Sequence, residues 1–167
     1  MKHLLAAAVL LGLSPVAGAT EISVSLGPDF TEKLTEDYGA REGEYLAERV
    51  RTDLQRAIDR SGADVARVDV TILDAKPSRP TFKQAGDMPG LDMHRSVSLG
   101  GMKLKAVAYD ASGTLTDEFE YKWYESDIRQ AGLTTWQDAR RASSRFASRL
   151  AQQIDKIDQN RRVTPRP

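Results

Sequence analysis

One histidine and two aspartates lie close together in the middle of the chain and could bind a metal ion or act in catalysis. His94 is the only histidine beyond position 3, and Asp87 and Asp92 precede it. Asp92 and His94 offer two metal ligands, but no cysteine, nearby histidine or His-x-x-x-His pair completes a set. His94 would also suit the base of a Ser-His-Asp triad, but there is no Gly-x-Ser-x-Gly turn. We therefore expect no metal, no cofactor and no catalytic residue.

Carboxylates are dense in a later segment, where apolar and charged residues alternate. They are Asp117, Glu118, Glu120, Glu125 and Asp127. A pair of carboxylates can cleave a glycosidic bond, and the neighbouring Trp123 and Tyr124 suit a sugar. The alternation, however, places most of these acids on one strand face beside lysines, which is typical of a solvated sheet surface. A hydrolase that acts on an envelope polymer is therefore kept as an alternative function.

Arginines form the third group. Arg141, Arg145 and Arg149 recur every four residues with Arg140 beside them, and no acid occurs between Ala139 and Ile154. On a helix this spacing produces a basic ridge. Such a ridge can contact lipid headgroups or an acidic polymer, form salt bridges with the acid-rich strand, or be solvated. We take Arg141, Arg145 and Arg149 as the candidate binding surface.

The charge of the chain is balanced overall but unevenly distributed. The formal net charge of the 167 residues is zero. Acidic residues outnumber basic ones by 21 to 15 over residues 20–134, whereas basic residues outnumber acidic ones by 8 to 3 over residues 135–167. This balance argues against nucleic acid as a partner.

Two segments have the periodicity of amphipathic helices. The first runs from Leu46 to Ile58 and ends at Gly62, because glycine accepts the left-handed conformation of a helix end. The second starts at residues 135–138, which resemble a capping box, and carries a longer apolar stripe. Its members are Trp136, Ala139, Ala142, Phe146, Leu150, Ile154 and Ile157. Residues 29–43 indicate only a loose helical turn or two, broken at Gly39 and Gly43.

Four segments alternate like half-buried strands: residues 22–26, 66–72, 97–108 and 115–123. The apolar parity changes at residues 100–101, which indicates a bulge or a bend. A turn at residues 110–113 joins the last two strands into a hairpin. Its inner face would carry Leu115, Phe119, Tyr121 and Trp123, and its outer face would set Lys103 and Lys105 against Glu118 and Glu120.

These elements predict an α+β fold with two layers, in the order β-α-β-β-β-α. A mostly antiparallel sheet of about four strands, with two main helices on one face, buries both helical stripes. Residues 20–159 would form one domain, and residues 160–167 a disordered tail. The long loop at residues 76–95 contains enough apolar residues to pack on the domain or to contact a partner.

The first nineteen residues have the pattern of a secretory signal peptide. Lys2 and His3 precede the apolar run 4–13, and Ala17-Gly18-Ala19 resembles a cleavage site. Val16-Ala17-Gly18 would begin a lipoprotein signal if a cysteine followed, but position 19 is alanine. We therefore expect a periplasmic or secreted protein without a transmembrane segment in the mature chain. Because the chain has no cysteine, its fold must be stable without disulfides.

The C-terminal part of the chain, from Ser98 on, resembles uncharacterised exported domains of bacterial envelopes. The residues that carry this resemblance are the run 98–102, the turn 110–113 with its following strand, and the Trp-Gln-Asp-Ala helix start. Many such domains are lipoproteins. The resemblance implies a small α+β envelope domain of unknown activity and assigns no site residue.

The sequence favours a non-enzymatic envelope domain that binds another envelope component, either a protein or an anionic surface. Two other functions stay open: the hydrolase described above, and a structural subunit that pairs through a sheet edge.

Overall fold

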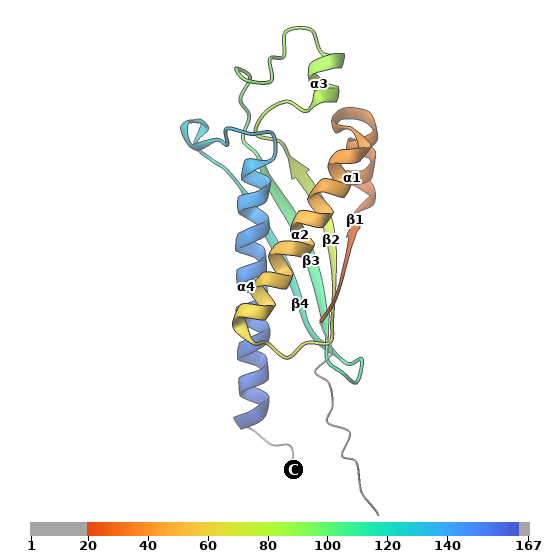
Figure 1. Ribbon diagram of the computed structural model, residues 1–167, viewed down its shortest axis with the longest axis vertical. Helices are drawn as coiled ribbons and strands as arrows, with labels where there is room; N and C mark the ends of the chain where they lie inside the picture. The colour runs from red at the N-terminus through yellow and green to blue at the C-terminus, as the bar shows by residue number, and fades with distance from the viewer. Residues whose placement is uncertain (1–19, 164–167) are drawn as a thin grey trace, which may run out of the picture.

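The computed structural model describes residues 20–163, so the predicted signal peptide 1–19 and positions 164–167 of the predicted tail lie outside the described residues. Figure 1 shows the elements in chain order. They are β1 (Glu21–Leu26), α1 (Pro28–Lys33), a π-helical turn (Leu34–Tyr38), α2 (Ala40–Ser61), β2 (Arg67–Lys76), α3 (Phe82–Asp87), β3 (Gly101–Tyr109), β4 (Leu115–Tyr124), a 3-10 turn (Ile128–Gln130) and α4 (Gln137–Val163).

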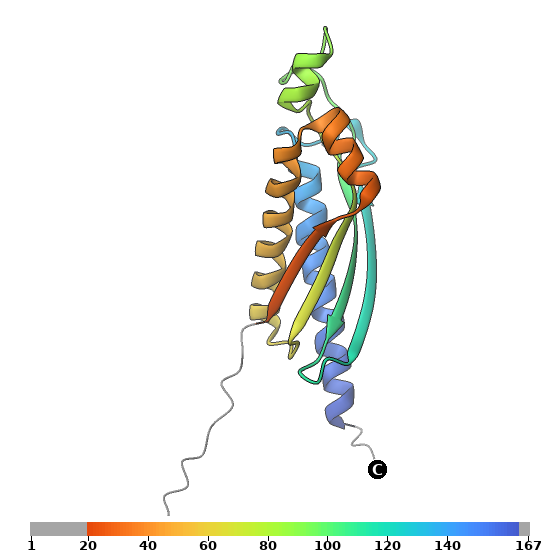
Figure 2. The same ribbon diagram turned by 90° about the vertical axis from the view of Figure 1, so that its right-hand side faces the viewer.

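The strands form one mixed sheet in the order β1-β2-β3-β4. β1 runs parallel to β2, and the other two pairs are antiparallel. Helices α2 and α4 lie side by side on one face of this sheet (Figure 2). The predicted α+β fold with two layers is therefore confirmed, including the two main helices on a single face.

The core lies between the sheet and these two helices. Alternate residues of β2 and β3 are buried against the helices, namely Val68, Val70, Ile72, Met102, Leu104, Ala106 and Ala108. Helix α2 contributes the predicted stripe from Leu46 to Ile58, and α4 contributes its stripe up to Ile154. The ring of Phe146 stacks on that of Phe119, with centroids 5.9 Å apart. Strand and helix periods thus supply one continuous apolar layer.

The segment before α2 is more regular than its sequence indicates. Phe30, Leu34 and Tyr38 recur every four residues and are all buried, and α1 runs directly into the π-helical turn. Gly39, with a φ of 103°, separates that turn from α2. Gly43 was predicted to interrupt the helix, but it lies inside α2. Leu26 and Leu34 pack against its backbone there. Small size, rather than flexibility, is what Gly43 contributes.

The long loop differs from its prediction in two ways. It contains helix α3, which starts at a capping box formed by Thr81 and Gln84. It also continues to Gly100, because β3 begins only at Gly101. Val97 and Leu99, which were predicted to start the strand, lie in the loop and are 40% and 39% exposed. The predicted parity change at residues 100–101 therefore marks the boundary between loop and strand.

The hairpin has the predicted pairing with one irregularity. The register shifts by one residue where Ala108 faces Asp117 and Tyr109 faces Leu115. This extra residue on β4 reverses the alternation at the end of the hairpin. Leu115 is therefore 52% exposed instead of lining the inner face, whereas Tyr121 lies in the core.

Helix α4 departs from its prediction at both ends. Thr135 forms no capping box with Asp138; its hydroxyl donates to the carbonyl of Pro80. At the other end the helix continues to Val163, beyond the boundary at 159 that was expected from composition. Arg161 in this extension lies 3.5 Å from Asp110 of the hairpin turn, so the extra turn contacts the domain.

On the outer face of the sheet, a glycine lets a tyrosine reach across a strand. Gly101 pairs with Tyr124, and a Cβ at Gly101 would lie only 2.3 Å from the Trp123 carbonyl oxygen. The Tyr124 hydroxyl crosses β3 to donate to Asp74 of β2 at 2.6 Å. Lys33 of α1 donates to the same carboxylate at 2.7 Å. Asp74 thereby ties α1, β2 and β4 together.

We predict that Gly101→Ala lowers the free energy of unfolding by about 3 kcal/mol, because the new methyl group meets backbone atoms that cannot rotate away. Urea denaturation measures the effect. Gly86→Ala in α3 is the matched control: nothing lies near its Cβ position, and a helical alanine stabilises by up to about 1 kcal/mol. Equal denaturation midpoints for the two variants would contradict the close approach at Gly101.

The Asp74 cluster also predicts a pH dependence. Burial raises the pKa of Asp74, but the hydrogen bonds from Lys33 and Tyr124 outweigh it and hold this pKa below its ordinary value of 3.8. The stabilisation from Asp74 is therefore complete above that value and is lost as the pH falls through the folded-state pKa.

Asp74→Asn should consequently be less stable than the wild-type protein at neutral pH, and the gap should narrow below about pH 3.8. Urea midpoints measured along an acid titration check this. The pKa values of Asp92, Asp110, Glu120 and Asp127 are also lowered, but they affect both proteins equally. The exposed Asp64→Asn serves as control; a gap for Asp74→Asn that does not change with pH would refute the assignment.

Candidate arginine binding face

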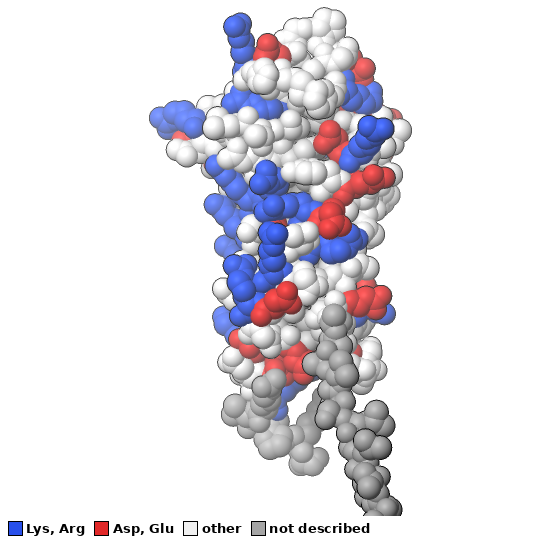
Figure 3. Space-filling model, in the orientation of Figure 1, with Lys and Arg blue, Asp and Glu red and all other residues white. Residues whose placement is uncertain are grey.

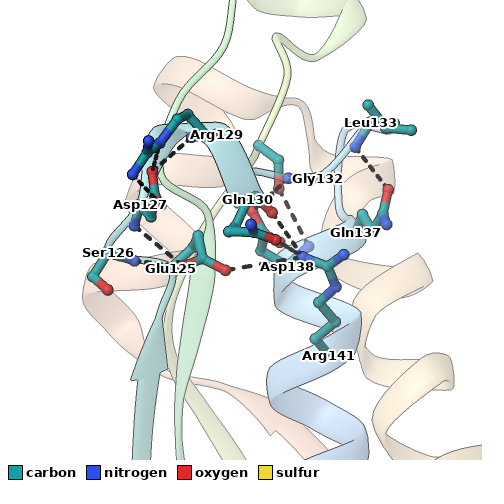
Figure 4. A network of polar contacts seen from close by, with 11 residues as sticks. Glu125, Ser126, Asp127, Arg129, Gln130, Gly132, Leu133, Gln137, Asp138 and Arg141 are labelled. Atoms are coloured by element: carbon teal, nitrogen blue, oxygen red, sulfur yellow. Dashed lines mark hydrogen bonds and ion pairs between the residues drawn. The ribbon is translucent and has the colours of Figure 1, made fainter.

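Helix α4 begins at a buried carboxylate that fixes its position. Asp138 is fully buried, and its Oδ2 accepts hydrogen bonds from the Ser78 hydroxyl at 2.8 Å and the Gly132 amide at 2.9 Å. Its Oδ1 accepts from Nη1 of Arg141 at 2.8 Å (Figure 4). The carboxylate therefore joins the loop after β2, the segment before α4 and the first turn of α4.

Arg141 is engaged by the chain itself. Besides Asp138, its Nη1 donates to the Gln130 carbonyl at 3.0 Å and lies 4.0 Å from Oε2 of Glu125. Figure 4 shows that Glu125 also turns back to the amides of Ser126 and Asp127. Of the three predicted ridge residues, Arg141 is thus the one that forms salt bridges near the acid-rich strand.

Arg145 and Arg149 instead lie over aromatic rings of β4. The guanidinium carbon of Arg145 is 4.2 Å from the centre of the Trp123 ring, and that of Arg149 is 5.1 Å from the Tyr121 ring. A guanidinium held over an aromatic face is attracted to it, and its N–H groups point outward in its own plane. Both arginines are exposed. Their side chains are therefore positioned while their donors face solvent.

The acids of β4 do not neutralise these two arginines. Glu120 pairs with Lys103 at 2.7 Å and Glu118 pairs with Lys105, both on the outer face of the sheet. Asp117 turns to the helix side, where it accepts from Gln153 at 3.0 Å. Within residues 20–163, no carboxylate forms an ion pair with Arg145 or Arg149. Figure 3 shows the resulting gathering of basic side chains along α4.

The histidine segment lies on the surface of the domain. His94 is exposed on the long loop, and its amide and that of Arg95 both donate to Asp92 at 2.8 Å. These hydrogen bonds lower the pKa of Asp92. Asp87 pairs with Lys83 of its own helix. In the described part of the chain, no group of three or more histidine and carboxylate side chains is placed to hold a metal ion.

The loop around His94 packs on the domain in part and exposes other apolar side chains. Pro77 and Pro80 are buried, whereas Phe82 is 79% and Met88 47% exposed. A hollow of about 410 Å³ lies between the loop and Tyr38.

Sequence reasoning identified the ridge but missed what positions it. Trp123 was considered as a core or sugar-binding residue, and its role as a platform for Arg145 depends on which helix turn lies above β4. Asp138 was assigned to a capping box, and its partners Ser78 and Gly132 come from other segments. The one usable signal was the match between arginines every four residues on a helix and aromatic residues every two on a strand.

Comparisons with known proteins find similarity to solved structures. No family model and no curated protein matches the chain. The structure is similar to the crystal structure of a minor lipoprotein from Acinetobacter baumannii, with 14% sequence identity and a TM-score of 0.31. The similarity covers 86% of this chain and 95% of that chain. Separately, none of the helices between residues 20 and 163 combines the length and the apolar character that crossing a membrane requires.

We predict that Asp138→Ala lowers the free energy of unfolding by about 3 kcal/mol or more, because it leaves the buried Ser78 hydroxyl and Gly132 amide without their acceptor and Arg141 without its nearest carboxylate. Urea denaturation with tryptophan fluorescence measures the loss. Glu118→Ala removes an equal charge from the exposed sheet face and should leave the midpoint unchanged. A variant at 138 that is as stable as the one at 118 would show that Asp138 does not anchor α4.

Proposed function

We propose that this chain is an exported, non-enzymatic domain of the cell envelope that binds an anionic membrane surface through Arg141, Arg145 and Arg149. The observation that carries the proposal is the pair Arg145 and Arg149, which are held over aromatic rings without a carboxylate partner in the described chain. Export is supported by the signal-peptide pattern of residues 1–19.

Fixed arginines suit a phospholipid surface for two reasons. A guanidinium binds phosphate through two parallel hydrogen bonds and is weakly hydrated, so little is lost when it leaves water. The rings of Trp123 and Tyr121 also order the two side chains in advance, which reduces the entropy that binding would otherwise cost. Successive ridge residues are about 6 Å apart along the helix, which allows each to contact a separate headgroup.

The acids of β4 do not oppose this function, because they lie elsewhere. Glu118 and Glu120 are on the opposite face of the sheet and are paired with lysines. The helix side of the domain therefore presents arginine to an approaching surface, and the outer sheet face presents balanced charge. This separation makes binding orientation-specific although the chain has no net charge.

The proposal predicts that Arg145→Gln/Arg149→Gln weakens binding to anionic vesicles about 30-fold, because each arginine near such a surface contributes about 1 kcal/mol. Sedimentation of the mature protein with phosphatidylcholine vesicles, with and without phosphatidylglycerol, measures this. Binding of the wild-type protein should require phosphatidylglycerol and weaken as salt shortens the screening length from about 10 Å at 0.1 M to about 3 Å at 1 M.

The matched control removes the same two charges from other surfaces. Arg95→Gln/Lys122→Gln alters the exposed loop and the outer sheet face, and should keep vesicle binding close to that of the wild-type protein. If both double variants lose binding equally, net charge rather than the arginine ridge is responsible. If the wild-type protein binds no phosphatidylglycerol vesicles at all, the proposed function is wrong.

A further inference from the structure

A hollow of about 350 Å³ lies between helices α2 and α4. It shares Arg141 with the ridge, but its other lining residues are different. The lining residues are Arg49, Thr134, Gln137, Arg140, Arg141 and Ser144. We propose that this hollow is a binding site for a single phosphoryl group. The inference rests on the proposed function for its setting, since it names the headgroup chemistry that the arginine face would recognise.

Arg140 provides the main argument. Its Nε is buried and donates no hydrogen bond in the described structure, and none of its guanidinium nitrogens takes part in an ion pair there. A buried donor without a partner is costly, and a cation without a counter-ion leaves a favourable interaction unmade. Nε itself is closed off from solvent, but Arg140 lines the hollow, so an anion bound there would supply the counter-charge that this guanidinium lacks in the described structure.

The other lining groups are also hydrogen-bond donors. Nε of Arg49 is held by Asp53 at 3.0 Å, which leaves its terminal nitrogens for a ligand. Gln137 accepts the Leu133 amide at its Oε1 at 2.7 Å, which leaves its NH2 group as the end without a partner (Figure 4). Thr134 and Ser144 add hydroxyls, and within residues 20–163 no carboxylate lines the hollow.

Charge balance indicates which kind of anion fits. Asp53 is buried behind Arg49 and Asp138 behind Arg141, so each of these arginines has a compensating carboxylate. Arg140 has none in the described chain, and one positive charge is therefore left over. A monoanion with several oxygens balances this charge. A phosphodiester in a lipid headgroup and singly charged inorganic phosphate are both anions of this kind.

A carboxylate fits the hollow less well. Its two oxygens lie in one plane and are satisfied by a single guanidinium fork. The hollow offers donors from three arginines, two hydroxyls and one amide that come from two helices and a loop. Tetrahedral phosphoryl oxygens can reach donors that converge from several directions. The volume also lies within the range of about 300–1,000 Å³ that is usual for small-molecule sites.

The test uses Arg140→Gln, which keeps most of the side chain and removes its charge. Titration of the mature protein with inorganic phosphate and with glycerophosphoglycerol, followed by 31P NMR and calorimetry, should show binding of both by the wild-type protein. Loss of one charge-assisted contact should weaken the affinity of Arg140→Gln about 10-fold or more.

The matched control is Arg56→Gln, which changes an exposed residue of α2 and should bind as the wild-type protein does. Binding of phosphate alone would identify a free anion as the ligand class, and stronger binding of glycerophosphoglycerol a lipid headgroup.

Stability separates a ligand role from a structural one. Since Arg140 makes no hydrogen bond through its buried Nε, Arg140→Gln should have the same urea midpoint as the wild-type protein, or a higher one. A lower midpoint together with unchanged phosphate affinity would overturn the inference. So would failure of the wild-type protein to bind either probe.

The same experiments distinguish this inference from the proposed function. Arg145→Gln/Arg149→Gln should lose vesicle binding while it keeps the phosphate affinity of the wild-type protein. If phosphate binds in an Arg140-dependent manner but vesicles do not bind, the hollow stands and the membrane function fails. If vesicles bind through the ridge but phosphate binding does not depend on Arg140, the membrane function stands and the inference about the hollow fails.

Discussion

The burial of one helical stripe constrains the rest of this molecule. The chain contains no cysteine, so α4 is held by packing, and Phe146 and Leu150 are almost completely buried between the sheet and α2. At about 100° per residue, Arg145 and Arg149 then lie to one side of Phe146 and Arg140 lies to the other. The same packing therefore directs two arginines towards β4 and one towards α2. Ridge and hollow are two consequences of a single helix rotation.

Packing of an apolar stripe leaves a helix free to slide along its axis, and the buried polar groups remove that freedom. Asp138 can accept from Ser78 and Gly132 only at one axial position of α4. In the second turn of the helix, the Ser143 hydroxyl donates to Asp53 of α2 at 2.8 Å. These two contacts fix the register of α4 against both the loops and α2. The distance between Arg145 and the Trp123 ring depends on that register.

The spacing of apolar residues predicted the layers of this fold, because each helix and each strand buries the face on which its apolar residues recur. The stripe of α4 and the alternation of β2 and β3 could be read directly from the sequence. What could not be read depends on contacts between distant segments. Gly43 has the sequence signature of a helix break, but it lies within a helix because Leu34 and Leu26 need the space. Leu115 follows the inner-face pattern, but a single extra residue on β4 turns it outward.

The candidate site shows the same division. The spacing of the arginines was sufficient to predict the ridge, and the alternation of β4 was sufficient to assign Glu118 to the outer face with a lysine partner. Neither pattern could show which arginines of α4 would form an ion pair with a carboxylate. That outcome follows from the pairing of β3 with β4, because Lys103 and Lys105 are one strand away from the acids and α4 lies on the other face. Pairing within the sheet therefore neutralises the acids locally and leaves the arginines of α4 as a separate positive surface. Charge balance over the whole chain and charge separation across the sheet are compatible for this reason.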